Sequence, residues 1–600
     1  MNNLAEAAAT PSPSGEQIPP PATAAPSFVT IRLNLAQIGM LLALLVAGAS
    51  RFANLGRIPL APAEAQAALH AWQPWQAGVS DPLQPASPAY ATLTTLVMAV
   101  VGDSDATARL IPALFGLALV FLPWLLRQRI GVWGALTASL ALAISPLGTS
   151  AARTADGAAI ALFAAMLLVL SRLRFLEKAE RAWFYTLWVA LGLGLISAPL
   201  FYSALIGIML AWVAQATLGP ALVETTPYPE RAVIRQGALI TVGIVLALGT
   251  FFFWNPAGLG SVGNILGQWL GQFDFRTNLL NWATPILVLA RYEPIPFFFG
   301  LTAVIWALWR GQPLPSFLAY WLVGALVTVL LQPGNLVNGL LLTLPGSLLC
   351  GAFVNHLLQQ TGEWWDAYTG RLKWALAFFL LVIFAAGIAS LARHMQIIRI
   401  TPQDFYNLWI AVTLLVFAVA VISYLWVWDR IIVKQGVTMG LLIFLVVFSW
   451  GSSWWLNQTA ANDTRTSWVT QASDDELPLL IRTIEEFSEQ RKQARYDLHI
   501  FTAVDTPVLR WYLRRFRQLE VGASVPASAV YDAILTANEP EQTFGADYVG
   551  SDFGLLRPDT PQTFDVASAA RGLLFREFSA PVNEARVILW LRANLVSRQN

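Results

Sequence analysis

Residues 87–131 read SPAYATLTTLVMAVVGDSDATARLIPALFGLALVFLPWLLRQRIG, and this stretch decides the fold. Two apolar runs, at about 88–102 and 106–126, enclose a short acidic segment, and Arg127 and Arg129 follow the second run. A run of about 20 apolar residues is long enough to cross the hydrocarbon core of a membrane, which is about 30 Å thick. The second run therefore predicts a membrane span with a basic end. The first run is short and is compatible either with a span or with a segment that does not cross the membrane.

Composition extends this pattern to most of the chain. Of the 600 residues, 56% are hydrophobic and 12% are charged, whereas soluble domains carry about 25% charged residues. A soluble protein of this composition would expose large apolar patches, so an ordinary soluble enzyme is excluded. We predict thirteen spans, at about 33–50, 106–126, 131–149, 156–172, 182–196, 199–217, 234–254, 294–309, 316–331, 335–357, 372–392, 408–428 and 436–455.

Basic residues set the orientation of these spans. If 88–102 lies on the outer surface instead of crossing, the basic residues between spans gather on one side, as the positive-inside rule requires of the cytoplasm. Three of the four lysines in the chain, Lys178, Lys373 and Lys434, then lie in cytoplasmic loops. This orientation predicts a cytoplasmic N-terminus and an outer C-terminus.

The chain divides into three parts by composition. Residues 1–30 are rich in Ala, Pro and Ser and are predicted to be a disordered cytoplasmic tail. Residues 31–455 are predicted to form the transmembrane domain, with long outer loops at 51–105 and 255–293. Residues 456–600 hold 34 of the 73 charged residues, which predicts a soluble domain outside the membrane.

The C-terminal part alternates between helical and strand patterns. Residues 476–494 and 506–517 have helical periodicity, and the second of these helices carries the basic and aromatic motif WYLRRF (511–516). Residues 497–504 and 531–537 have the pattern of strands. The alternation predicts a small extracytoplasmic α/β domain. The predicted fold class is therefore a polytopic α-helical membrane protein with a small C-terminal α/β domain.

Three carboxylates are expected at the outer ends of the spans. Glu64 lies in PLAPAEAQAALHAWQPW (59–75), a predicted short helix of the first outer loop. Asp156 begins the fourth span, and Glu293 follows Tyr292 at the end of the second long outer loop. Acidic groups at membrane depth are costly and usually face a cavity or a partner. Each is also compatible with the simpler role of a helix-end or interface residue.

Two arginines are expected to accompany these carboxylates. Arg109 opens the second span, and Arg153 precedes Asp156 by three residues. This spacing puts both side chains on one helix face if the helix begins that early. An arginine can bind a phosphate bidentately, and a carboxylate can accept a proton from a hydroxyl group. The cluster is therefore suited to a polar substrate that carries a phosphate.

The sequence predicts no cofactor and no nucleic-acid partner. The net charge of +1 provides no basic field for nucleic acid. Cys350 is the only cysteine, and the four histidines lie in unrelated segments. This pattern predicts no metal site.

The order of these motifs resembles the GT-C superfamily of integral-membrane glycosyltransferases. The resemblance covers about 35–350 and rests on 87–131, SPLGTSAARTAD (145–156), FWNPAGLG (253–260) and RYEP (291–294). It is closest to prokaryotic members similar to dolichyl-phosphate-mannose protein mannosyltransferases and aminoarabinose transferases. The last two motifs resemble a subgroup described as flippase-activity-associated membrane proteins.

This resemblance implies a polyprenyl-phosphate sugar as donor, used without a metal ion at the outer face of a prokaryotic plasma membrane. The catalytic base of the family is an Asp in the first outer loop, commonly in an Asp-Glu pair. In this sequence the pair falls on Ala63 and Glu64, so the Asp is absent. The second acidic position of the family matches Asp156, with Arg153 as its companion.

The first hypothesis is glycosyl transfer from that donor to a glycan, lipid or protein acceptor. Glu64 would deprotonate the acceptor hydroxyl, and Asp156 would orient the acceptor or an arginine. Arg153 or Arg109 would stabilise the departing lipid phosphate. The neighbouring residues Tyr292 and Glu293 would bind the sugar or the acceptor.

Two other functions stay open. Because Ala63 replaces the family's Asp, the protein is alternatively a catalytically impaired member that binds lipid-linked sugar or takes part in assembling cell-envelope glycans. A lipid-sugar flippase or transporter is the third hypothesis. Transporters commonly contain internal repeats and midplane polar groups, whereas this sequence has no clear repeat and its charges gather at one face.

Overall fold

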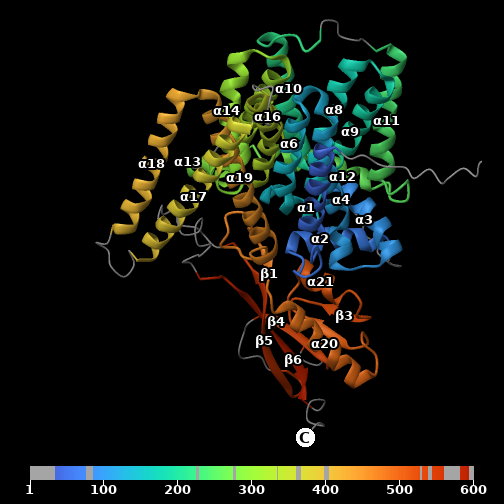
Figure 1. Cartoon of the computed structure of the whole chain (residues 1–600). Coiled ribbons are helices and arrows are strands. Elements are labelled where there is room, and N and C mark those ends of the chain that lie inside the picture. The colour runs from blue at the N-terminus through green and yellow to red at the C-terminus, as the bar shows by residue number, and fades with distance from the viewer. Residues whose placement is uncertain are drawn as a thin grey trace, which may run out of the picture.

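The computed structural model consists of a helical bundle joined to a C-terminal sheet domain (Figure 1). The described residues are 34–75, 85–223, 229–273, 279–333, 335–359, 367–397, 405–526, 530–537, 544–559 and 581–593. The predicted disordered tail, 1–30, lies outside them.

Ten helices of the described chain are long and apolar enough to span a membrane. They are α1 (Leu35–Phe52), α4 (Asp105–Leu125), α8 (Ala158–Lys178), α10 (Pro199–Thr217), α11 (Arg231–Gly249), α15 (Pro313–Leu331), α16 (Leu340–Gln359), α17 (Ala367–Ile397), α18 (Tyr406–Trp428) and α19 (Arg430–Trp454). Two bent pairs add up to two further spans: α6 (Val132–Ile144) with α7 (Pro146–Arg153), bent by 58°, and α13 (Leu279–Tyr292) with α14 (Pro294–Arg310), bent by 107°. The chain is thus a multi-pass membrane protein.

Each of the thirteen predicted apolar runs forms a helix or part of a bent helix pair, but within the described ranges only ten helices, or up to twelve spans if each bent pair counts as one, are long and apolar enough to cross a membrane. The run at 182–196 is α9 (Arg181–Leu195), whose 15 residues span only about 22 Å at 1.5 Å per residue. The short run at 88–102 is α3 (Pro88–Val101), which packs on α4 and on α2 (Pro62–Trp72). The remaining short elements are η1 (Gln73–Trp75), α5 (Arg127–Ile130), α12 (Gly258–Leu270), η2 (Leu336–Gly339) and η3 (Trp455–Thr459).

Proline explains the break in both bent spans. Pro146 and Pro294 each occupy the first turn of the second helix of a pair. Proline lacks the N–H that an uninterrupted helix needs, and it disfavours helical backbone at the residue before it. The residues before the two prolines, Ser145 and Glu293, are therefore polar groups placed at a break within a span.

The C-terminal domain is a six-stranded mixed sheet with two helices. Its strands are β1 (Ala472–Ser473), β2 (His499–Thr502), β3 (Gln518–Val521), β4 (Ala533–Ala537), β5 (Tyr548–Arg557) and β6 (Ala585–Arg592), in the order β1-β5-β6-β4-β2-β3. Strand β2 is parallel to β3 and β4, and the other pairs are antiparallel. Helices α20 (Leu477–Lys492) and α21 (Pro507–Leu513) pack with it.

Two features of this domain differ from the sequence prediction. The helix expected at 506–517 ends at Leu513, because Arg514 and Arg515 leave the helix and bind the transmembrane domain. Strands β1, β3, β5 and β6 were not predicted. Much of β3 and half of β5 is exposed, so their sequences lack the buried apolar pattern of β2 and β4.

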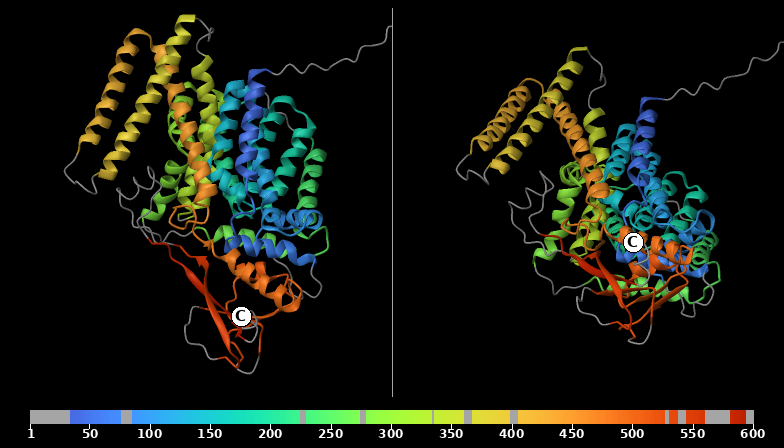
Figure 2. Two further views of the ribbon diagram at one scale, coloured as in Figure 1. Left: turned by 60° about the horizontal axis from the view of Figure 1, so that its bottom comes forward. Right: turned by 90° about the horizontal axis from the view of Figure 1, so that it is seen from below.

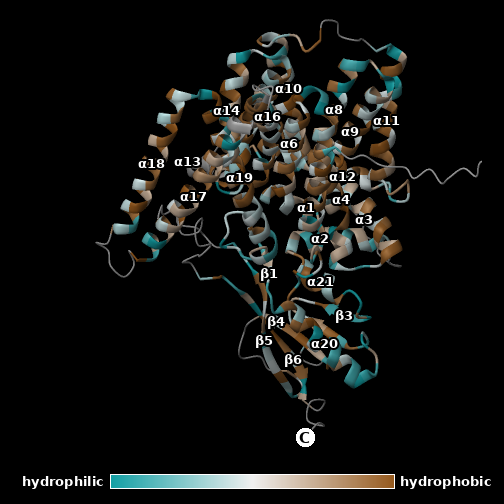
Figure 3. Cartoon of the chain, in the orientation of Figure 1, coloured by the Kyte–Doolittle hydropathy of each residue, from teal (hydrophilic) through white to brown (hydrophobic). Residues whose placement is uncertain are grey.

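The two domains share one apolar core. Leu60, which precedes α2, and Ala68 and Leu69 of α2 belong to the same buried cluster as Leu509 and Trp511 of α21. Figure 2 shows the two domains from two further directions, and in its left view the sheet lies below the helices. Colouring by hydropathy separates the largely apolar bundle from the mixed sheet domain (Figure 3). The sheet domain is thus packed firmly against the loops at one end of the bundle.

Candidate functional site

A buried ion pair joins α2 to α4. The Nε of Arg109 donates to Oε1 of Glu64 at 2.9 Å, and its Nη2 donates to Oε2 at 2.6 Å. Both side chains are 7% exposed. Such a bidentate pair is a strong, charge-assisted contact with a fixed geometry.

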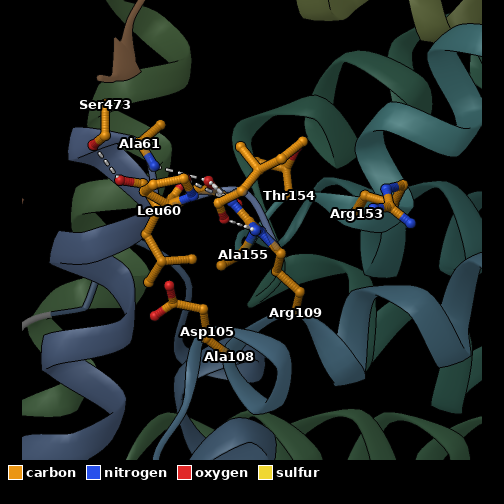
Figure 4. Close-up of polar contacts among 12 residues, drawn as sticks. Leu60, Ala61, Asp105, Ala108, Arg109, Arg153, Thr154, Ala155 and Ser473 are labelled. Carbon is orange, nitrogen blue, oxygen red and sulfur yellow. Dashed lines mark hydrogen bonds and ion pairs between the residues drawn. The ribbon is translucent and has the colours of Figure 1, made fainter. Parts of the chain in front are cut away.

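Glu64 also accepts two hydrogen bonds from the backbone. The N–H of Ala61 donates to Oε2 at 2.9 Å and the N–H of Ala155 donates to Oε1 at 2.8 Å (Figure 4). Burial alone raises the pKa of Glu64, but the charge and hydrogen bonds of Arg109 and the two backbone donors bring that pKa below its usual value. A carboxylate held in this way is a weak proton acceptor.

Arg109 also binds the backbone of the segment between α1 and α2. Its Nη1 donates to the carbonyl groups of Leu55 at 3.1 Å and Ile58 at 2.7 Å, and its Nη2 donates to that of Pro59 at 3.2 Å. The guanidinium thus fixes the chain between α1 and α2. Its position on the first turns of α4 brings Glu64 to the end of the bundle that carries the C-terminal domain.

Arg153 caps the end of α1. Its Nη1 donates to the carbonyl oxygens of Ser50, Arg51 and Ala53, at 3.1, 3.1 and 2.8 Å. A cation at a helix C-terminus is stabilised by the unpaired carbonyl groups there. In Figure 4 the guanidinium of Arg153 lies apart from the dashed contacts around Arg109.

Glu64, Arg109 and Arg153 line one small pocket. The pocket has a volume of about 70 Å³, and Asn457, Asn462 and Ser473 from the start of the C-terminal domain close it. Ligand pockets usually measure about 300–1,000 Å³. A sugar or lipid phosphate would therefore need these walls to move apart.

Asp156 lies next to this cluster but does not line the pocket. It follows Ala155, the backbone donor to Glu64, and its Oδ1 accepts from the N–H of Ala158 at 2.9 Å. Arg153 ends α7 and α8 begins at Ala158, so the expected shared helix face of Arg153 and Asp156 was wrong. No Lys or Arg among the described residues pairs with Asp156. Burial raises its pKa to about 7, against the hydrogen bond from Ala158, which lowers it.

The raised pKa of Asp156 predicts a pH-dependent effect on stability. In the folded protein the carboxyl keeps its proton up to about pH 7, whereas in the unfolded chain it ionises near pH 3.9. Its contribution to the free energy of unfolding therefore falls as the pH rises from about 4 to about 7. We expect Asp156→Asn to melt above the unmodified protein at pH 8, with the difference shrinking towards pH 5. A difference in melting temperature that does not change with pH would contradict this.

Tyr292 and Glu293 lie at the other end of α7. Glu293 accepts hydrogen bonds from the hydroxyl of Ser145 and from the N–H of Leu147, at the first turn of α7. Arg153 ends the same helix, whose eight residues span about 12 Å. Tyr292 is buried, and the Arg291 guanidinium lies 5.2 Å from the centre of its ring. Neither residue lines the pocket of Glu64 and Arg153.

Arg51 is a buried cation that sequence reasoning did not single out. It is 1% exposed, and it donates to the carbonyl groups of Leu142 and Ala143 at the C-terminus of α6. Its position at the end of the first apolar run was a visible signal, because an arginine there needs a partner.

A second cluster joins the sheet domain to the segment before α4. Asp103 binds Arg514 and Arg515, each at 2.8 Å. Asp105 accepts from the Nε1 of Trp511 at 2.8 Å and from the hydroxyl of Tyr512. The acidic segment of 87–131 and the motif WYLRRF were both visible in the sequence, but nothing there indicated that they bind each other.

Metal binding has no candidate site in the described ranges. There, no three His, Cys, Asp or Glu side chains gather closely enough to hold an ion. The charged groups of the cluster instead bind one another and the backbone.

A match to a protein family indicates the class of protein that the chain resembles. Residues 84–235 match the model of a family described as dolichyl-phosphate-mannose-protein mannosyltransferase. This match confirms the predicted resemblance to GT-C glycosyltransferases, and the matched segment contains Arg109, Arg153 and Asp156. No curated protein sequence matches the chain.

Particular solved structures resemble the chain at low identity. ArnT from Cupriavidus metallidurans bound to undecaprenyl phosphate is 15% identical, with a TM-score of 0.48, over 93% of this chain and 98% of that chain. The apo state of the same protein has a TM-score of 0.49 at 15% identity, over 94% and 99% of the two chains. The Archaeoglobus fulgidus oligosaccharyltransferase in the apo form is 10% identical, with a TM-score of 0.43, over 81% and 64%.

Proposed function

We propose that the protein is a membrane glycosyltransferase that uses a polyprenyl-phosphate-linked sugar at the membrane face carrying the C-terminal domain. The observation that carries this proposal is the charged cluster at that face, formed by the buried side chains of Glu64, Arg109 and Arg153 and the partly buried Asp156. Charged groups buried at membrane depth are costly and mark functional sites by default. The family match supports the donor class, because its description names a sugar on dolichyl phosphate.

In the proposed reaction, the acceptor hydroxyl oxygen forms a bond to the anomeric carbon while the bond from that carbon to the lipid phosphate breaks. The hydroxyl proton passes to a carboxylate, and the phosphate leaves on the lipid. Asp156 is a better candidate for the base than Glu64, because its pKa is raised to about 7. A general base works best when its pKa lies near the pH at which the enzyme works. Glu64 then acts as a positioning residue that holds Arg109 and the segment before Asp156.

The experiment that tests this proposal compares two substitutions, each of which replaces a carboxylate by an amide of nearly the same shape. Asp156→Asn is expected to lower turnover about 100-fold or more, the usual contribution of a general base. The measurement is release of polyprenyl phosphate from polyprenyl-phosphate hexoses by the full chain in nanodiscs, with a cell-envelope extract as acceptor. Asp505→Asn changes an exposed carboxylate of the sheet domain and serves as the control. Unchanged turnover in Asp156→Asn would remove the assignment of the base.

A second candidate function is binding of lipid-linked sugar without turnover. It is favoured by Ala63, which is exposed on α2 beside a Glu64 carboxylate that accepts four hydrogen bonds. This function predicts binding of the donor with no release of polyprenyl phosphate. It also predicts that Ala63→Asp creates release where the unmodified chain has none.

A further inference from the structure

An apolar cavity lies within the bundle at the end away from the C-terminal domain. Helices α14, α16, α18 and α19 enclose it, and its volume is about 780 Å³. Most of its wall is aromatic or aliphatic, and several of these side chains face outward at the surface of the bundle. Phe298 is 53% and Trp309 is 87% exposed. The cavity therefore opens to the lipid that surrounds the spans.

The length of this cavity matches one leaflet of a membrane. Its lining runs along α14 from Phe298 to Arg310 and along α19 from Leu445 to Lys434. These segments of thirteen and twelve residues have end-to-end lengths of about 17–18 Å at a rise of 1.5 Å per residue. Half of the hydrocarbon core measures about 15 Å, so a fatty acyl chain of one leaflet fits along the groove.

One end of the cavity carries three basic side chains. Arg310, His356 and Lys434 all line it, and Nη2 of Arg310 lies 3.5 Å from Nε2 of His356. The Nζ of Lys434 lies 5.7 Å from the ring centre of Trp426. No Asp or Glu lines the cavity among the residues that the structure describes. Positive charge at one end and an apolar wall along the rest complement an anionic lipid.

We propose that this groove, formed by α14, α16, α18 and α19, binds an anionic phospholipid of the leaflet on the predicted cytoplasmic side. The phosphodiester headgroup lies between Arg310, His356 and Lys434, and one acyl chain lies against the aromatic wall. Basic pockets between spans on the cytoplasmic side are sites for anionic headgroups. This site is independent of the proposed transfer reaction, because the cluster of Glu64 lies at the opposite end of the bundle.

The test uses the full chain in neutral detergent and native mass spectrometry. We expect phosphatidylglycerol to bind more tightly than phosphatidylcholine with the same acyl chains. Each basic side chain near a headgroup contributes about fivefold to affinity for an anionic lipid. The double variant Arg310→Gln/Lys434→Gln is therefore expected to lower the affinity for phosphatidylglycerol about 25-fold. It is expected to lower the affinity for phosphatidylcholine less, because the choline cation balances the charge of that lipid's phosphodiester.

The matched control removes the same charge elsewhere at the same bundle end. Arg231→Gln/Arg235→Gln changes two exposed arginines of α11, which do not line the groove. It is expected to keep the affinity for phosphatidylglycerol within about twofold. Equal losses in both double variants would overturn the site and leave only a general charge effect.

Two further arms examine the apolar part of the site. Val437→Trp, which fills the groove without changing charge, is expected to weaken binding of phosphatidylglycerol. Inorganic phosphate is expected not to displace the lipid, because it makes no contact with the aromatic wall. Displacement by inorganic phosphate, or tighter binding of a polyprenyl phosphate than of phosphatidylglycerol, would overturn the assignment of the occupant.

Discussion

Arg109→Ala is expected to destabilise the transmembrane domain by about 3–5 kcal/mol, the usual effect of removing one partner of a buried ion pair. The variant leaves Glu64 almost fully buried without its cation, and it releases the backbone of Leu55, Ile58 and Pro59. The measurement is the melting temperature of the full chain in detergent. Arg57→Ala, an exposed arginine of the same loop, is the control and is expected to change little.

The pH dependence of this variant follows from the lowered pKa of Glu64. The stabilisation by the pair is present above the pKa of the unfolded chain, near pH 4.3, and is lost as the pH falls through the lower pKa of the folded protein. The melting difference between Arg109→Ala and the unmodified chain should therefore be full at pH 7 and smaller below pH 4.

A double-mutant cycle measures the interaction between Glu64 and Arg109 separately from the other contacts that each side chain makes. The double variant Glu64→Gln/Arg109→Ala removes both charges and so leaves no unpaired buried charge. It is therefore expected to destabilise the protein by less than the sum of the two single changes. Additive losses would mean that the two side chains are not coupled and would contradict the ion pair.

The spans were predictable because burial in lipid demands long uninterrupted apolar runs. The helices α1, α4 and α10 begin and end within two residues of the runs that predicted them. The strands β5 and β6 were not predictable in the same way, because their stability depends on pairing between 548–557 and 585–592. That pairing is set by distant chain segments and leaves a weak local pattern.

The sequence predicted which residues form the candidate site better than it predicted which groups those residues bind. The cost of charge at membrane depth singled out Glu64, Arg109 and Arg153 from the sequence. Their partners were not predictable, because Arg153 binds carbonyl groups of α1 and Glu64 binds the N–H of Ala155. Backbone groups are present at every residue, so sequence carries no signal for which of them a side chain will bind.

For the same reason, the sequence did not indicate the contact between the two domains. Asp103 and Asp105 stand in the segment most typical of the family, yet their side chains bind the C-terminal domain. The hydroxyl of Tyr512 also accepts from the N–H of Leu60 at 2.9 Å. Leu60 adjoins the first-loop segment held by Arg109, so this contact joins the sheet domain to the charged cluster.

The double variant Asp103→Ala/Asp105→Ala is therefore expected to release the sheet domain from the bundle. Hydrogen bonds to charged groups contribute about 1.5–3 kcal/mol each, and this variant removes contacts to Trp511, Tyr512, Arg514 and Arg515. A net loss of about 3 kcal/mol corresponds to about a hundredfold faster hydrogen exchange in α21, if exchange follows domain opening. The measurement is hydrogen–deuterium exchange of the full chain, followed by mass spectrometry.

The control for this prediction is a carboxylate of similar chemistry beside the same helix. Asp505 pairs bidentately with Arg510, at 2.6 Å for each contact, but both residues are exposed. Exposed pairs contribute about 0–1 kcal/mol, so Asp505→Ala is expected to leave exchange in α21 nearly unchanged. Equal exchange in both variants would mean that the apolar contacts of Leu509 and Trp511 alone hold the domains together. Faster exchange only in the double variant would assign the docking to the two aspartates and, through Leu60, couple it to the charged cluster of Glu64.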